Sequence, residues 1–252
     1  RLTGWQTGES DVLARNTTGW LQRDTEQGVD FTGIVFYDGQ GFRVSKALGV
    51  SSAKELDGAS ICIQMGTTTD RNVSEYFAAN KMTFKPVSFE SADEATVLYD
   101  KGRCDVYTTD ISGLAARRTA LSNPADHIIL GDVISKEPLG PSVRQGDQAW
   151  ADVNRWVLSA LLVAEELGVT SQNVDAMLKS DLPAVRHLLG VEGKTGEMLG
   201  LPKDWAYQMV KQVGNYGEIF ERNIGMNTPL KIERGLNAQW NKGGLMYGLP
   251  VR

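Results

Sequence analysis

Short apolar runs alternate with amphipathic stretches through the first half of the chain. The runs ASICIQ (59–64), KPVSF (85–89) and CDVYTTD (104–110) are typical of buried strands. Each is followed by a stretch with helical spacing, and after the first of them Val73, Tyr76 and Phe77 stand at positions i, i+3 and i+4. This alternation predicts an α/β fold with a mostly parallel sheet and helices on both faces.

Composition narrows the class of protein. The chain has 252 residues, enough for one large domain or two smaller ones. Its net charge is −5, and an acidic surface disfavours binding to nucleic acid or anionic membranes. The longest apolar candidate, which begins at Trp156, is interrupted by Glu165 and Glu166 and falls short of the ~20 residues of a transmembrane helix. From the net charge we expect no nucleic-acid partner, and from the interrupted apolar run we expect no transmembrane helix.

The two cysteines leave two interpretations open. Cys62 and Cys104 both lie in strand-like runs, so they could be free buried thiols or could form a disulfide. Spacing alone does not show whether two sulfur atoms meet. His127 and His187 add no metal-ligand spacing to the cysteines, so the sequence predicts no metal site and no cofactor.

Small polar residues follow the predicted strands, where ligands bind in doubly wound sheets. Asn16, Thr17 and Thr18 come after the run DVLAR, while Thr109 and Asp110 end the run CDVYTTD. The segment GTTTD (66–70) precedes a predicted helix, whose first backbone N–H groups could meet an anion. Arg23 offers a planar fork for a carboxylate, and Asp110 could bind an ammonium group. Together these groups match an α-amino acid.

Each of these features also has a simpler interpretation. The segment GTTTD could do no more than cap a helix, because Thr and Asp do so routinely. Arg23 precedes Asp24 and Glu26, which is typical of a solvated surface ion pair. Asp110 could likewise be a helix cap.

Longer motifs indicate a family. They are DVLARNTTGWLQRDTE, YDGQGF, ELDGASICIQMGTTT, GRCDVYTTDISGL, ISKEPLGPSVRQGD, EELGVTSQNVD, LGLPKDWAYQMVKQVGNYGEIFERN and LNAQWNKGGL. With these motifs the chain resembles the periplasmic substrate-binding proteins of polar-amino-acid ABC transporters, in the general L-amino-acid-binding branch. The resemblance implies a type II periplasmic-binding-protein fold of two α/β lobes. Two crossing strands join the lobes and act as a hinge, about which the lobes close on a ligand. It also implies a periplasmic location and a precursor with a signal peptide.

The resemblance assigns roles to individual residues. The carbonyl of Asn16 and the hydroxyl of Thr18 would take the ligand's ammonium group, and Arg23 its carboxylate. The second lobe would add backbone N–H groups near Thr67 and Thr68, with Asp110 pairing with the ammonium group. Gln64 and Thr109 stand where the family reads the ligand side chain, which gives a bias toward polar amino acids. The predicted ligand-binding residues are Asn16, Thr17, Thr18, Arg23, Gln64, Thr67, Thr68, Thr109 and Asp110.

The family fold has three further implications. It makes the strands of Cys62 and Cys104 neighbours in lobe 2, which favours a disulfide between them. It assigns residues 1–42 and 139–252 to lobe 1 and residues 43–138 to lobe 2. It implies two partners, an L-amino acid ligand and the membrane permease of the transporter.

Family members carry a strand, a helix and a second strand before the position of Arg1. We therefore expect an N-terminally truncated lobe 1 and a homodimer formed around residues 1–40 and the C-terminal helices, with Trp5 and Trp20 as candidate contacts. The alternative is a monomer whose C-terminal tail covers the gap. Three other functions remain: a truncated interaction variant that binds no amino acid, a receptor's sensing module, and a dehydratase. The dehydratase is disfavoured because neither histidine follows a predicted strand.

Overall fold

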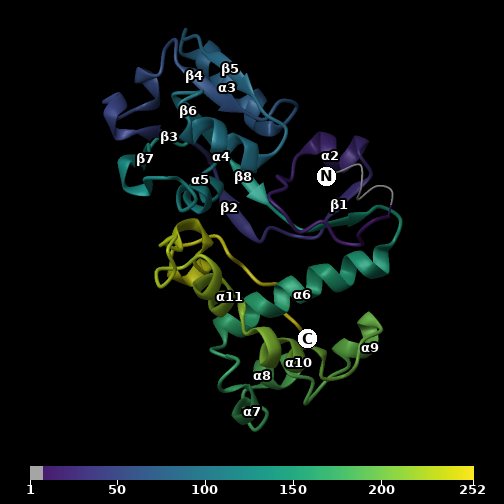
Figure 1. Ribbon diagram of the computed structural model, residues 1–252. Coiled ribbons are helices and arrows are strands. Elements are labelled where there is room, and N and C mark those ends of the chain that lie inside the picture. Colours follow the sequence, from purple (N-terminus) through teal and green to yellow (C-terminus); the bar gives the residue numbers. More distant parts are fainter. Residues whose placement is uncertain (1–7) are drawn as a thin grey trace. The chain divides into compact units, whose positions relative to one another are not determined.

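The computed structural model describes residues 8–252, which fall into two compact units. Unit 2 is the continuous segment Asp38–Pro138, and unit 1 is built from the chain up to Tyr37 and from Leu139–Arg252. The chain passes between the units in strands β2 (Phe36–Asp38) and β8 (Glu137–Leu139), which pair with each other (Figure 1). The first crossing lies before the expected boundary at residue 42, because the residues from Gln40 onward already pair within the unit 2 sheet.

Unit 2 contains a five-stranded sheet in the order β5-β4-β6-β3-β7. Its strands are β3 (Gln40–Ser45), β4 (Ser60–Ile63), β5 (Lys85–Ser88), β6 (Val106–Asp110) and β7 (His127–Ile129). Strand β4 runs parallel to β5 and β6, whereas β3 is antiparallel to β6 and β7. Strands β4, β5, β6 and β7 therefore point the same way, and the expectation of a mostly parallel sheet holds for every strand of this sheet except β3. The sheet is mixed because β3 enters it directly from the crossing strand β2, without a crossover helix to make it parallel.

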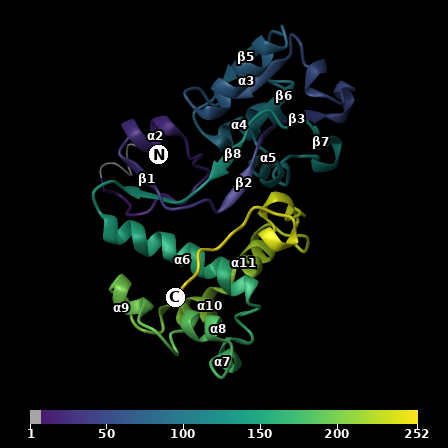
Figure 2. The same ribbon diagram turned by 180° about the vertical axis from the view of Figure 1, so that it is seen from behind.

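Helices cover both faces of this sheet, as expected. Helix α3 (Thr68–Ala79) packs Val73 and Phe77 on one face. Helices α4 (Ala92–Asp100) and α5 (Ile111–Arg118) cover the opposite face with Tyr99 and Leu114 (Figures 1 and 2). Successive strand residues alternate between the two cores, with Ile61 and Ile63 facing α3 and Cys62 facing α4 and α5.

Unit 1 is mainly helical. Its helices are α2 (Leu21–Glu26), α6 (Gln148–Glu166), α7 (Val174–Met177), α8 (Pro183–Leu188), α9 (Thr195–Leu199), α10 (Trp205–Val213) and α11 (Tyr216–Asn223). Helix α6 packs against α8, α10 and α11, and Figure 2 shows it running past them. A short antiparallel pair, β1 (Val29–Phe31) with β9 (Ser142–Arg144), accompanies them. Short 3-10 helices span Lys46–Leu48, Ala53–Glu55, Pro124–Asp126, Gly235–Asn237 and Trp240–Lys242.

The run DVLAR forms no strand, contrary to its apolar pattern. Only Leu13 pairs, as an isolated bridge to Ser142. Strand β9 is only three residues long, so this bridge does not extend into a ladder. Across the described residues, no helix is long and apolar enough to cross a membrane.

Polar side chains attach the C-terminal tail to the rest of unit 1. The side chain of Asn237 bonds to both the backbone N–H (2.6 Å) and the carbonyl (3.1 Å) of Tyr37. Arg234 forms a largely buried ion pair with Glu165 of α6 at 3.0 Å. The tail therefore packs on α6 and the start of the first crossing strand.

Candidate functional site

The carboxyl ends of β4 and β6 lie at the same edge of the unit 2 sheet, because these strands are parallel neighbours. The segment that follows β4 carries Gln64 and Thr67, and it leads into α3. Strand β6 ends in Thr109 and Asp110. The structure thus brings together the unit 2 part of the predicted site.

Thr67 caps helix α3, so the simpler interpretation of GTTTD is confirmed as far as its side chain is concerned. Its Oγ accepts from the N–H of Asp70 at 3.4 Å and donates to the Gln64 carbonyl at 2.7 Å. The first-turn amides of a helix have no acceptor inside the helix. Those near Thr67 and Thr68 are consequently suitable donors for a carboxylate, and the helix dipole favours an anion there.

Asp110 occupies the N-cap position of α5, yet its side chain makes no capping hydrogen bond. The Asp38 carboxylate performs that task, accepting from both the backbone N–H and the hydroxyl of Ser112. Burial raises the pKa of Asp38, and its hydrogen bonds with Ser112 and Gly39 oppose part of that rise. Asp110 is itself only 8% exposed. The capping interpretation of Asp110 is therefore wrong.

Gln40 is a residue at this edge that the sequence did not identify, and it bonds to Thr108 at the end of β6. Gln40 lies directly opposite Asp110 in the pairing of β3 with β6. Its Nε2 donates to the Thr69 carbonyl at 3.1 Å and to the Thr108 hydroxyl at 2.9 Å. No sequence motif pointed to this link, because it depends on β3 lying beside β6.

Gln64 and Thr109 were expected to contact a ligand side chain. Both are half-buried. The amide of Gln64 donates to the Glu90 carbonyl at 3.0 Å, and Thr109 pairs with Gly41 in the sheet. Their place at the strand ends is compatible with the expected role, which stays a prediction.

The other predicted residues belong to unit 1. Arg23, on α2, is 6% exposed, so it is not the solvated surface side chain of the simpler interpretation. Its Nη1 donates to the Thr18 carbonyl at 2.8 Å. Thr17 and Thr18 are buried next to it, whereas Asn16 is exposed. The structure brings Thr17, Thr18 and Arg23 together within unit 1.

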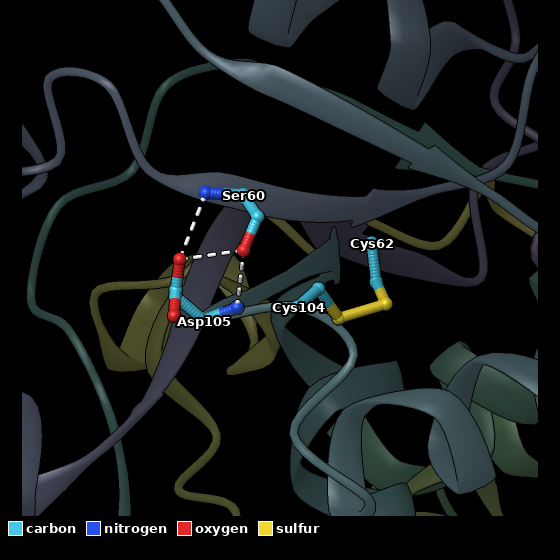
Figure 3. The surroundings of a disulfide bond; sticks show 4 residues. All are labelled: Ser60, Cys62, Cys104 and Asp105. Carbon is cyan, nitrogen blue, oxygen red and sulfur yellow. Dashed lines mark hydrogen bonds between the residues drawn. A yellow bond between two sulfur atoms is a disulfide. The ribbon is translucent and has the colours of Figure 1, made fainter.

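The predicted disulfide is present. Cys62 of β4 and Cys104, just before β6, are bonded with their Cα atoms 5.6 Å apart. Figure 3 shows that Ser60 and Asp105 bond beside them, so the same two segments are joined twice. In residues 8–252 no group of three or more His, Cys, Asp or Glu side chains is placed to hold a metal ion.

Known proteins resemble this chain along its whole length. The General L-amino acid-binding periplasmic protein AapJ of Rhizobium johnstonii is 56% identical over 254 residues, an alignment that spans 100% of this chain and 74% of that protein. The Glutamate/glutamine/aspartate/asparagine-binding protein BztA of Rhodobacter capsulatus is 52% identical over 253 residues, spanning 100% and 75%. The chain belongs to the periplasmic amino-acid-binding proteins of ABC transporters.

A solved structure from this family of binding proteins supports the same assignment. It is an ABC transporter periplasmic binding protein from Brucella ovis with glutathione bound, 60% identical in sequence. It matches with a TM-score of 0.98 over 100% of this chain and 80% of its own. The type II periplasmic-binding-protein fold is thereby confirmed, and the protein is a periplasmic solute-binding component. No protein-family model matches the chain.

Proposed function

We propose that this binding protein takes up L-α-amino acids by their ammonium and carboxylate groups, with a bias toward polar side chains, and delivers them to a membrane permease. One observation carries the proposal. Asp110 is the last residue of β6, and the first turn of α3 follows β4. Because β4 and β6 are parallel neighbours, the Asp110 carboxylate and the α3 amides belong to the same edge of the sheet. An anionic group beside amide donors is the complement of an α-amino acid.

Unit 1 supports the proposal with a positive charge. Arg23 is held by the Thr18 carbonyl and is removed from solvent. A guanidinium group with restricted motion and low exposure binds a carboxylate more strongly than a solvated one does. Arg23 therefore suits the ligand's α-carboxylate.

The polar bias rests on Gln64 and Thr109, whose side chains offer hydrogen-bonding groups at the strand ends. Two relatives narrow the choice of ligands to test. BztA is described as binding glutamate, glutamine, aspartate and asparagine, and the Brucella ovis protein holds glutathione. The γ-glutamyl end of glutathione carries a free α-ammonium and α-carboxylate group. The same recognition would therefore serve both ligand types, and glutathione is a second candidate ligand.

Calorimetric titration of the whole chain tests the assignment. L-glutamate, L-glutamine and glutathione should each be titrated into the wild-type protein and into Arg23→Ala. We expect the variant to lose about 2–5 kcal/mol of binding free energy, because a desolvated carboxylate loses its charged partner. The exposed Arg15 supplies the control, and Arg15→Ala should bind as the wild type does. Equal affinity in wild type and Arg23→Ala would refute the role of Arg23, and no binding of any of the three ligands would refute the function.

We propose binding without catalysis. His127 lies in the edge strand β7 and His187 in α8 of unit 1, so neither stands at the edge where β4 and β6 end.

The permease partner and the homodimer remain predictions. Trp5 lies outside the described residues, and Trp20 is half-buried beside Arg23. Light scattering that gives a monomer mass across micromolar concentrations would refute the dimer.

A further inference from the structure

Gln40 bonds to both α3 and β6, the two elements that carry the proposed binding site for the ligand's ammonium and carboxylate groups (its head group). Its Nε2 reaches the carbonyl of Thr69, in the first turn of α3, and the hydroxyl of Thr108, two residues before Asp110. The Thr108 hydroxyl in turn donates to the Gly41 carbonyl at 2.7 Å, so it must accept from Gln40. This chain of bonds fixes which end of the amide points toward α3.

The same amide group is costly for folding. Gln40 is 1% exposed, and within residues 8–252 its Oε1 is buried with no hydrogen-bond partner. A buried acceptor without a donor costs free energy that an apolar side chain of similar size would not incur. A residue chosen only for stability at this position would be apolar. What sets Gln40 apart from a merely buried amide is the place of its two donated bonds, which join α3 to β6 beside Asp110.

We propose that Gln40 is a positioning residue for the ligand's head group, an inference that rests on the proposed function. By holding the start of α3 to β6, Gln40 sets the distance between the α3 amides and the Asp110 carboxylate. In an α-amino acid one carbon atom lies between the carboxylate carbon and the ammonium nitrogen, and in a β-amino acid two do. A fixed distance between the two protein groups selects the α-isomer.

The test compares L-glutamate with its β-amino isomer, 3-aminoglutarate, which has the same atoms and charges. In the whole chain, Gln40→Met keeps the length of the side chain but removes the two donated bonds. We expect the Kd for L-glutamate to rise about tenfold and the preference for L-glutamate over the β-isomer to shrink. We also expect the midpoint of chemical denaturation to stay the same or rise, because the unmet Oε1 is gone.

A matched control lies in unit 1. Gln239 is 2% exposed, donates to the Leu162 carbonyl at 3.2 Å and likewise buries an Oε1 that has no partner within the described chain. Gln239→Met should change stability in the same sense and leave both affinities unchanged. Thr108→Val removes the hydroxyl that accepts the hydrogen bond from Gln40. The loss of affinity in the double variant Gln40→Met with Thr108→Val should therefore be smaller than the sum of the two single losses.

Three outcomes would overturn the inference. One is Gln40→Met with lowered stability and unchanged affinities, which is what a purely structural role predicts. Another is an equal loss of affinity in Gln239→Met, and a third is full additivity of Gln40→Met with Thr108→Val. If the wild type binds no L-glutamate, glutamine or glutathione, the proposed function itself fails, and the role of Gln40 fails with it.

Discussion

At the scale of single residues, Arg43 is buried between two tyrosine rings on the α4 and α5 face of the unit 2 sheet. Its Cζ lies 4.6 Å from the ring centroid of Tyr99 and 5.0 Å from that of Tyr107, and its Nη1 donates to the Leu114 carbonyl at 3.3 Å. Burial lowers the pKa of Arg43 from its ordinary value. The Tyr99 hydroxyl lies 2.7 Å from Nδ1 of His127. His127 is therefore close enough to the buried Arg43 guanidinium for that charge to affect its pKa.

His127 should make unit 2 less stable in mild acid. Burial first, and then the charge of Arg43, lowers the pKa of His127 below 6.5, while Asp100 and Asp126 oppose the shift. The unfolded chain therefore binds a proton more readily than the folded protein between the folded pKa and 6.5. The stability is full above 6.5 and is lost as the pH falls toward the folded pKa. Urea denaturation at about pH 7.5 and about pH 5.5 should show this loss.

His127→Gln is the control for this titration, because it should reduce the difference between the two pH values. An NMR titration of the ring resonances in a His187→Gln background reports on His127 alone. A midpoint at or above 6.5 would contradict the prediction.

At the scale of elements, the sequence predicted the alternation of strands and helices in unit 2 because side-chain periodicity is local. It did not predict the direction of β3, since strand pairing depends on partners distant in the sequence. The same limit separates the site residues that were found from those that were missed. Asp110 and Arg23 were identified by charge and position, whereas Gln40 and Asp38 gain their roles only because β3 and β6 are neighbours.

A local capping signal sets the break between α10 and α11. Gly214 adopts a positive φ of 81°, and Asn215 then starts α11 with a capping box. Asn215 accepts from the N–H of Glu218 at 2.9 Å, and the Glu218 carboxylate accepts from the N–H of Asn215 at 2.8 Å. The Asn215 amide also donates to the Val169 carbonyl. Asn215 thus both caps the start of α11 and bonds the turn between α10 and α11 to the backbone at Val169.

Asn215→Ala should lower the free energy of unfolding of unit 1 by about 1–2 kcal/mol, because both the cap and a buried hydrogen bond are lost. Urea denaturation followed by far-UV circular dichroism measures the change. Asn241→Ala, at an exposed asparagine of a short 3-10 helix, should leave stability within about 0.5 kcal/mol of the wild type. A loss in Asn215→Ala no larger than in Asn241→Ala would show that the box adds nothing.

At the scale of the whole molecule, the disulfide belongs entirely to unit 2. It joins residues 42 apart in the sequence, and a loop of that length restricts the unfolded chain by about 4 kcal/mol in the chain-entropy description. Cys62→Ala with Cys104→Ala should therefore lower the stability of unit 2 by about that amount. The family resemblance predicted this bond, which neither the spacing of the cysteines nor their burial could.

Hydrogen exchange separates the two units in this experiment. Amides in β4 and β6 should exchange faster in the double variant, while those of α6 should keep their protection. Similar acceleration in α6 would mean that the two units unfold together. Calorimetry should then show one transition in place of two.

The insertion of one unit within the other also sets the order in which the protein can be made. Unit 2 is the unbroken stretch Asp38–Pro138, so all of it is synthesised before any residue of Leu139–Arg252. Unit 1 needs both of its segments, and the long helix α6 belongs to the later one. During synthesis a domain can fold once its own residues have emerged. All residues of unit 2 can therefore be present, before its disulfide forms in the periplasm, while unit 1 still waits for its second segment.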